Sequence, residues 1–151
     1  MSAFNPETFL DTTHKESNAT TLIPVPEGVW AAHVVKIDVR QLISEGEPPR
    51  VVVDLGWEIE EDAVKKATGM DRPIAVQTLW IDTTPEGGLD MGTGKNVGLG
   101  RLREALGQNK AGKPWSFNHL REARAMVEVI HASSKKDDTI YARVKRIAQK
   151  G

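Results

Sequence analysis

The sequence contains no cysteine and few aromatic residues, with four Trp, three Phe and one Tyr among 151 residues. Without cysteine the chain has neither a disulfide framework nor a thiolate metal site. No apolar run approaches the roughly 20 residues that a membrane-spanning helix requires. The first ten residues lack the basic start and apolar centre of a secretory signal. These absences predict a cytosolic protein that does not act at a membrane.

The net charge of −1 conceals an uneven distribution along the chain. Residues 1–90 contain seven Lys and Arg against sixteen Asp and Glu, a balance of −9, whereas residues 91–151 contain thirteen against five, a balance of +8. One interpretation is a basic surface for a polyanion, offset by acidic residues elsewhere. The other is that opposite charges mix once the chain folds, so the distribution alone does not decide between them.

A predicted helix stands at the centre of the chain, within the stretch Leu89–Gly107. The stretch begins with glycines, and Leu99, Leu102 and Leu106 then follow at spacings of three and four residues. That spacing places the leucines on one face of a helix. Gly107 stands where a helix C-cap is expected.

Three strand-like runs precede this helix and two follow it. The predicted strands are residues 29–41, 51–59, 73–82, 125–131 and 139–147. Residues 60–72 are predicted as a short helix or a long loop, and residues 1–27 as an N-terminal arm. Three strands, a helix and two strands is the chain order of a five-stranded OB-fold barrel. The predicted fold is therefore mainly β with one or two helices, an OB-fold-like barrel over residues 28–151 in the order β-β-β-α-β-β.

The alternation of apolar and polar residues in the second predicted strand, 51–59, indicates where Trp57 lies. Val53, Leu55 and Trp57 share one parity, so Trp57 is predicted to lie in the core. Gly56 inside the strand predicts a bulge or a sharp bend. In the third predicted strand both parities carry apolar residues, so the orientation of Trp80 is left open.

The N-terminal arm is mostly polar but carries Phe4, Phe9 and Leu10. Asn5 precedes a Pro-Glu pair and is predicted as the N-cap of a short helical turn. An arm with these apolar residues is able to cover a sheet edge or to reach a neighbouring subunit.

Basic and aromatic side chains on the predicted strands point to single-stranded nucleic acid. Binders of single strands combine a basic groove with aromatic side chains on which bases stack, each worth ~1–3 kcal/mol. The last predicted strand has this composition on its outward parity, and the first has a similar basic row. Two lysines fall in the loop before the last strand, one of the usual OB-fold binding loops. The predicted nucleic-acid-binding residues are Lys36, Arg40, Arg50, Trp80, Lys135, Lys136, Tyr141, Arg143 and Lys145.

No arrangement of residues predicts a catalytic, metal or cofactor site. Gly94-Lys95 does not open a phosphate-binding loop of the Walker type, because Leu89 stands where that motif requires glycine. The histidines, at positions 14, 33, 119 and 131, form no close pair in sequence. Asp54 and Asp82 flank strand ends, but nothing specifies a third metal ligand. The chain is therefore predicted to be non-enzymatic and to need no cofactor.

Five segments of the chain carry a resemblance to a known family. They are Phe4–Pro6 with Phe9-Leu10, Val25–Gly28, Asp54–Ile59, Gly88–Gly92 and Gly100–Gly107. Together they resemble a family of tailed-phage proteins encoded among replication genes, whose better-understood relatives resemble single-stranded-DNA-binding proteins with an OB-fold. The resemblance covers most of the chain, with structural rather than catalytic motifs. It implies coating of single-stranded phage DNA during replication or recombination, in the cytoplasm of the host cell.

The candidate partners are single-stranded DNA, phage replication or recombination proteins, and further copies of the chain. Many single-strand binders recruit proteins through an acidic C-terminal tail, whereas residues 144–151 are basic, so recruitment of that kind is not expected. Two other classes of function stay open. One is a protein-interaction or assembly module that uses the barrel and the arm, and the other is an enzyme with carboxylates clustered around Asp54 and Asp82. The basic rows are equally consistent with an ordinary solvent-exposed surface that binds no ligand. The small number of aromatic residues favours this second interpretation.

Overall fold

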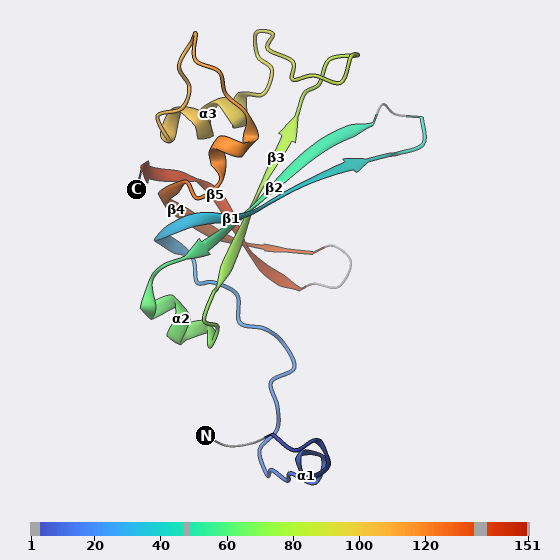
Figure 1. The fold of residues 1–151 in the computed structure, drawn as a ribbon, viewed down its shortest axis with the longest axis vertical. Helices are drawn as coiled ribbons and strands as arrows, with labels where there is room; N and C mark the ends of the chain where they lie inside the picture. The colour runs from blue at the N-terminus through green and yellow to red at the C-terminus, as the bar shows by residue number, and fades with distance from the viewer. Residues whose placement is uncertain (1–3, 47–48, 135–138, 151) are drawn as a thin grey trace.

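Five strands form a closed barrel in the structure, a computed structural model that describes residues 4–46, 49–134 and 139–150. The strands are β1 (Gly28–Leu42), β2 (Arg50–Ile59), β3 (Ile74–Ile81), β4 (Arg124–Ser133) and β5 (Ile140–Lys150). Around the barrel they follow the order β1-β2-β3-β5-β4 (Figure 1). The predicted mainly β fold with an OB-fold-like barrel is confirmed.

In the described part of the chain, three short α-helices accompany the barrel, α1 (Pro6–Leu10), α2 (Asp62–Thr68) and α3 (Val97–Ala105), together with a 3₁₀ turn, η1 (Phe117–Leu120). Their number exceeds the one or two that we predicted, since α1 and α2 add to the order β-β-β-α-β-β. α2 ends at Gly69, whose φ of 73° lies in the left-handed region that glycine adopts without a Cβ clash. Within the described ranges, none of the helices has the length and hydropathy of a membrane-spanning segment.

The barrel closes where β3 meets β5. β1 pairs antiparallel with β4 through its first half and with β2 along most of its length. β2 pairs antiparallel with β3, and β4 with β5. β3 and β5 run parallel and pair through Val76 and Arg143. Closure therefore sets the outward side of β5 beside that of β3, although α3 and β4 separate the two strands in sequence.

The inward side chains of the strands form one core. Leu55, Trp57 and Ile59 of β2 are completely buried, which confirms the predicted parity of that strand and the core position of Trp57. The Nε1–H of Trp57 donates a hydrogen bond of 2.9 Å to Oε1 of Gln77, a buried polar side chain on β3. This bond spares both groups the cost of burial without a partner.

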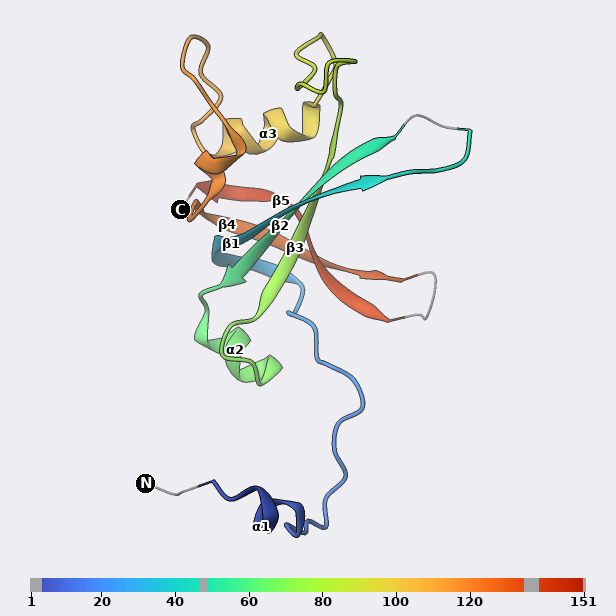
Figure 2. The ribbon, with the colours of Figure 1, turned by 45° about the vertical axis from the view of Figure 1, so that its right-hand side comes forward.

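α3 covers one end of the barrel with the face that its leucine spacing predicts. Leu99, Leu102 and Leu106 are buried and belong to the same cluster as the strand residues. Figures 1 and 2 place α3 and α1 at opposite ends of the molecule. The helix ends at Ala105, and Gly107 follows in the left-handed conformation with a φ of 71°.

The N-terminal arm leaves the barrel from the side opposite α3 (Figures 1 and 2). Its last residues are anchored, because Val25 is buried in the core and its carbonyl oxygen lies 2.8 Å from Nε2 of His131. All five residues of α1, in contrast, are exposed. Asn5 caps this helix as predicted, with its side-chain oxygen accepting a 3.0 Å hydrogen bond from the N–H of Glu7.

Asn96 ties the start of α3 to the end of β3. Its Oδ1 accepts a 2.7 Å hydrogen bond from the N–H of Asp82, and its Nδ2 donates to the carbonyl oxygens of Asp82 and Asp90, each at 2.9 Å. The carboxylate of Asp82 accepts a 2.9 Å bond from the N–H of Asn96 in return. Asn96 has a φ of 53°, a left-handed conformation that Asn tolerates better than most residues. Asn therefore suits this position through both its side chain and its backbone.

Replacing Asn96 with alanine removes these side-chain hydrogen bonds and keeps a Cβ in the left-handed region. We expect Asn96→Ala to lower the free energy of unfolding by about 2–5 kcal/mol, since unmet buried partners cost ~1–3 kcal/mol and the left-handed conformation ~1–2 kcal/mol. Asn96→Gly, which keeps only the backbone freedom, should lose about 1 kcal/mol less. Urea denaturation followed by circular dichroism measures both losses. Equal stability of Asn96→Ala and the unchanged protein would refute the role of this residue.

Candidate nucleic-acid interface

The outward side chains of β1, β2, β3 and the start of β5 form one continuous surface, named the outer β face from here on. Cross-strand pairing defines its rows, which are Arg40, Val52 and Trp80, then Asp38, Asp54 and Thr78, then Lys36, Gly56 and Val76. Arg143 extends the last row onto β5. The outer β face thus unites residues from four strands that lie far apart in sequence.

Trp80 is an exposed aromatic side chain of the outer β face, with 56% of its surface accessible. Its cross-strand partner is Val52, which has the outward parity of β2 and is nevertheless completely buried by its neighbours. The guanidinium carbon of Arg50 lies 5.9 Å from the centre of a Trp80 ring, within the range of a cation–π contact. Trp80, whose orientation the sequence left open, therefore presents its indole to solvent beside a cation.

β5 adds two cations and a second aromatic side chain. Tyr141 is 45% exposed, and Arg143 and Lys145 are exposed, as the parity of this strand predicts. Among the residues that the structure describes, neither Arg143 nor Lys145 has an ion pair or a hydrogen bond of its side chain. Lys145 also stands at a break in the register of β4 and β5, which leaves it without a directly opposite residue. Both cations are therefore accessible to an anionic ligand.

Arg40 is paired with another residue of the outer β face, Asp54. Its Nε donates a 2.6 Å hydrogen bond to the carboxylate of Asp54, which also accepts a 2.8 Å bond from the hydroxyl of Thr78. Burial alone raises the pKa of Asp54, but the hydrogen bonds from Arg40 and Thr78 and the charge of Arg40 outweigh burial and bring that pKa below its ordinary value. The hydrogen bond to Asp54 in turn raises the pKa of Arg40, against the opposing effect of desolvation. The positive charge of Arg40, which we predicted to contact nucleic acid, is thus already neutralised within the protein.

Lys36 is more loosely paired than Arg40. Its Nζ lies 3.3 Å from the carboxylate of Asp38, and both side chains are more than half exposed. An exposed ion pair of this kind is worth ~0–1 kcal/mol. Asp38 therefore holds this lysine only weakly.

Two hairpins border the outer β face. The β1–β2 and β4–β5 hairpins project from the same side of the barrel in both views (Figures 1 and 2). Arg50 begins β2 and lies next to the loop of the first hairpin. Lys135 and Lys136, which we predicted to contribute from the loop of the second, lie outside the described residues.

Trp80 and Tyr141 lie at opposite ends of the outer β face. Because β3 and β5 run parallel with Val76 opposite Arg143, Tyr141 stands level with Ile74, six residues before Trp80. At ~3.3 Å per strand residue, about 20 Å separates the two aromatic residues. They cannot enclose one base between them, so a strand that touches both must span several nucleotides.

The carboxylates of the enzyme hypothesis do not form a cluster with each other. Asp54 is bonded to Arg40 and stands opposite Thr78 of β3. Asp82 comes four residues after Thr78, just past the end of β3, and about 13 Å further along the extended chain. Asp82 is bonded to Asn96. The described part of the chain contains no group of three or more His, Cys, Asp or Glu side chains placed to hold a metal ion.

The third strand contributes more to the outer β face than we predicted. Ile74 and Val76 point outward and are exposed, and Thr78 fixes the carboxylate of Asp54. The outward orientation of Ile74, Val76 and Trp80 was not evident in the sequence, because the opposite, inward parity includes the polar Gln77. The exposed indole of Trp80 follows from the outward parity. An inward position for Gln77 would have predicted that Trp80 points outward.

The chain matches no protein-family model and no curated protein in sequence. The outer β face itself is therefore the basis for assigning a function. It offers an exposed indole, accessible cations on β5 and a position between two hairpins of a closed barrel.

The contact among Arg40, Asp54 and Thr78 predicts a pH dependence of stability. The folded pKa of Asp54 lies below the ordinary unfolded value of ~3.9, so the contact contributes stability that is fully present above that value. The contribution is lost as the pH falls through the folded pKa. We therefore expect Asp54→Asn to be less stable than the unchanged protein at neutral pH, with a difference that shrinks in acid.

Urea denaturation at neutral and acidic pH measures this difference. Thr78→Val is the matched variant, because it removes only one of the hydrogen bonds that lower the pKa of Asp54. It should show a smaller difference of the same sign. A loss of stability in Asp54→Asn that is independent of pH would contradict the assignment.

Proposed function

We propose that the protein binds single-stranded DNA on the outer β face, without catalysing a reaction. The observation that carries the proposal is the exposed Trp80 on one surface with the accessible Arg143 and Lys145. Single-strand binders join a basic groove to aromatic stacking platforms, and OB-folds use the face of their second and third strands with two hairpin loops. In this chain the third strand carries the indole, and the corresponding hairpins border the face.

Phosphate contacts supply most of the affinity in this proposal. The basic side chains of the outer β face are Lys36, Arg40, Arg50, Arg143 and Lys145, and the acidic ones are Asp38, Asp54 and Glu58, the last of which is bonded to Arg72. Arg40 must leave Asp54 before it meets a phosphate, whereas the cations of β5 are accessible at once. β5 therefore contributes more than β1. Since binding releases condensed counterions, affinity falls as salt rises.

Stacking supplies the contacts with bases. Trp80 offers its exposed indole, and Tyr141 offers a second ring about 20 Å away along the parallel strands. Because every base has a π-face, stacking tolerates any sequence. The protein thus binds single strands without reading their sequence, as coating requires.

The cellular role in the proposal rests on the sequence resemblance to a family of tailed-phage proteins. Coating of single-stranded phage DNA during replication or recombination fits an OB-fold-like barrel with an exposed basic and aromatic face. The proteins of those processes are the protein partners that this role implies.

A protein-interaction module is the second candidate function. The observation that favours it is the arm, where Phe4, Phe9 and Leu10 are each at least 60% exposed. Such a module has no affinity for oligonucleotides even at low salt. A titration with a fluorescent oligo-dT therefore separates the two functions.

Reversing the charge on β5 tests the phosphate contacts. Arg143→Glu combined with Lys145→Glu should weaken binding of oligo-dT by about tenfold or more at low salt, because two accessible cations become anions. The slope of log affinity against log salt should flatten by ~1.4, since each phosphate contact on a single strand contributes ~0.7. Folding should be unaffected, because both side chains are exposed.

The matched control is Lys110→Glu combined with Lys113→Glu. It changes the net charge by the same amount in the exposed loop that follows α3. This control should keep the slope of the unchanged protein. Unchanged affinity in the β5 variant would remove Arg143 and Lys145 from the binding surface, and binding that ignores salt would refute an electrostatic interface.

Trp80 provides an optical test of base stacking. It is exposed, whereas Trp30, Trp57 and Trp115 are buried or partly buried, so oligo-dT should quench mainly the fluorescence of Trp80. Trp80→Leu should weaken binding by about 5- to 150-fold, the equivalent of ~1–3 kcal/mol of stacking, and abolish most of the quench. Trp115→Phe should retain both binding and quench. Full quenching in Trp80→Leu would contradict stacking at this residue.

A further inference from the structure

Two hydrogen-bond donors on different strands converge on the carboxylate of Asp54, in the middle of the outer β face. Nε of Arg40, on β1, donates a 2.6 Å hydrogen bond to Oδ2, and the hydroxyl of Thr78, on β3, donates a 2.8 Å bond to Oδ1. Asp54 stands between them on β2. A cation and a hydroxyl that converge on two oxygen atoms make the charge-assisted contacts by which proteins hold anions. The outer β face therefore contains an anion site that a side chain of the protein occupies.

This anion site is open to solvent. The side chain of Arg40 is 48% exposed and that of Asp54 is 20% exposed. An arginine has five N–H donors, and the bond to Asp54 uses the one at Nε. Although burial raises it, the pKa of Asp54 lies below its ordinary value because of the bonds from Arg40 and Thr78 and the charge of Arg40. The occupant at neutral pH is thus an ionised carboxylate that an anion from solution has to displace.

The site lies next to the indole of Trp80. Thr78 comes two residues before Trp80 on the same face of β3, a rise of ~7 Å along the strand. Arg40 belongs to the cross-strand row of Trp80, and Val52 between them is completely buried. A single strand that stacks a base on Trp80 would therefore carry a phosphate group past Arg40 and Thr78.

We propose that the carboxylate of Asp54 stands in for a phosphate group and keeps a phosphate-binding site, formed by Arg40 and Thr78, closed until DNA displaces it. This inference rests on the proposed function, since it concerns the same surface and the same ligand. Asp54 acts as an internal competitor, because a phosphate reaches Arg40 only after the carboxylate has moved aside. The competition lowers the affinity for DNA below what the cations of the outer β face would otherwise give, and so favours release of the strand.

Removing the carboxylate should open the site. Asp54→Ser removes the charge and empties space between Arg40 and Thr78, so we expect oligo-dT to bind about 3- to 10-fold more tightly at low salt. The slope of log affinity against log salt should steepen by ~0.7, the contribution of one more phosphate contact on a single strand. Fluorescence titrations with oligo-dT at several salt concentrations measure both quantities.

Asp54→Asn is a second variant that keeps the size of the side chain and loses only its charge. It should show a smaller gain in affinity than Asp54→Ser, because the amide still fills the space that a phosphate would enter. Circular dichroism checks that both variants are folded. Weaker or unchanged binding of oligo-dT by both folded variants would overturn the proposal.

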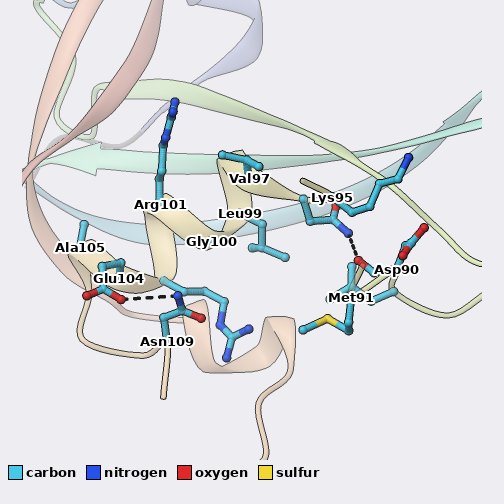
Figure 3. A pocket seen from close by; sticks show the side chains of 13 residues that line it. Asp90, Met91, Lys95, Val97, Leu99, Gly100, Arg101, Glu104, Ala105 and Asn109 are labelled. Carbon is cyan, nitrogen blue, oxygen red and sulfur yellow. Dashed lines mark hydrogen bonds between the residues drawn. The ribbon is translucent and has the colours of Figure 1, made fainter. Parts of the chain in front are cut away.

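The matched control is Glu104→Gln, which changes the net charge by the same amount. Glu104 lies on α3 beside a pocket at the end of the barrel, where its carboxylate accepts a 3.5 Å hydrogen bond from Nδ2 of Asn109 (Figure 3). This control should bind oligo-dT with the affinity and the salt slope of the unchanged chain. An equal gain in Glu104→Gln and Asp54→Ser would assign the effect to net charge and would overturn the proposal.

Second changes in the Asp54→Ser chain identify the groups that receive the phosphate. Adding Arg40→Gln should return the salt slope to that of the unchanged chain, because the cation of the site is lost. Adding Thr78→Val should cost more affinity than the same change costs in a chain that keeps Asp54, since neighbouring residues of one site are coupled. A gain that survives the loss of Arg40 would place the new phosphate contact elsewhere and contradict the assignment.

Failure of this inference differs from failure of the proposed function. If charge reversal of Arg143 and Lys145 weakens binding but Asp54→Ser does not strengthen it, DNA binds the outer β face and Asp54 is not a competitor. If neither the unchanged chain nor the Asp54→Ser chain binds oligo-dT at low salt, both proposals are wrong.

Discussion

The parallel contact between Val76 of β3 and Arg143 of β5 closes the barrel, and the candidate interface depends on it. With β5 paired only to β4, the cations of β5 would lie on a different surface from Trp80. The acidic first part of the chain and the basic last part meet at this seam. Asp54 is already neutralised by Arg40, which comes from the same acidic part of the chain. Closure therefore brings the cations of β5 beside β3, and Asp54 is not available to neutralise them.

The barrel could be predicted because its strongest signals are local. The alternation that buries Trp57 and the spacing that buries Leu102 each lie within one element. The bulge was predicted only in part, because Gly56 indicated a bulge or a bend on β2, whereas the extra residue, Val35, lies opposite Gly56 on β1. The register of β1 and β2 shifts between Val34 and Lys36, so the inward parity changes although the sequence continues without interruption. A bulge of this kind depends on how β1 bends between β4 and β2, which is a property of the closed barrel.

The candidate site was predictable in composition but not in pairing. Arg143 and Lys145 lie outward as their strand parity indicates, and their contact with nucleic acid stays a prediction. Arg40 was equally basic in sequence, but the register of β1 and β2 places the carboxylate of Asp54 within 2.6 Å of it. Ion pairs between strands depend on register, which no single segment specifies. Lys36 differs, because Asp38 lies two residues along the same strand and on the same face, where sequence alone could have found it.

The dependence of α3 on the barrel has a consequence for assembly in the cell. Nine residues with two internal glycines are too few for a helix that persists alone, since isolated helices need ~12–15 residues even with favourable sequences. α3 exists because Leu99 and its neighbours bury against the barrel end and Asn96 holds its start. Its solvent-facing surface is therefore present only after the strands have closed. A partner that recognised this surface would therefore bind folded domains and not incomplete ones.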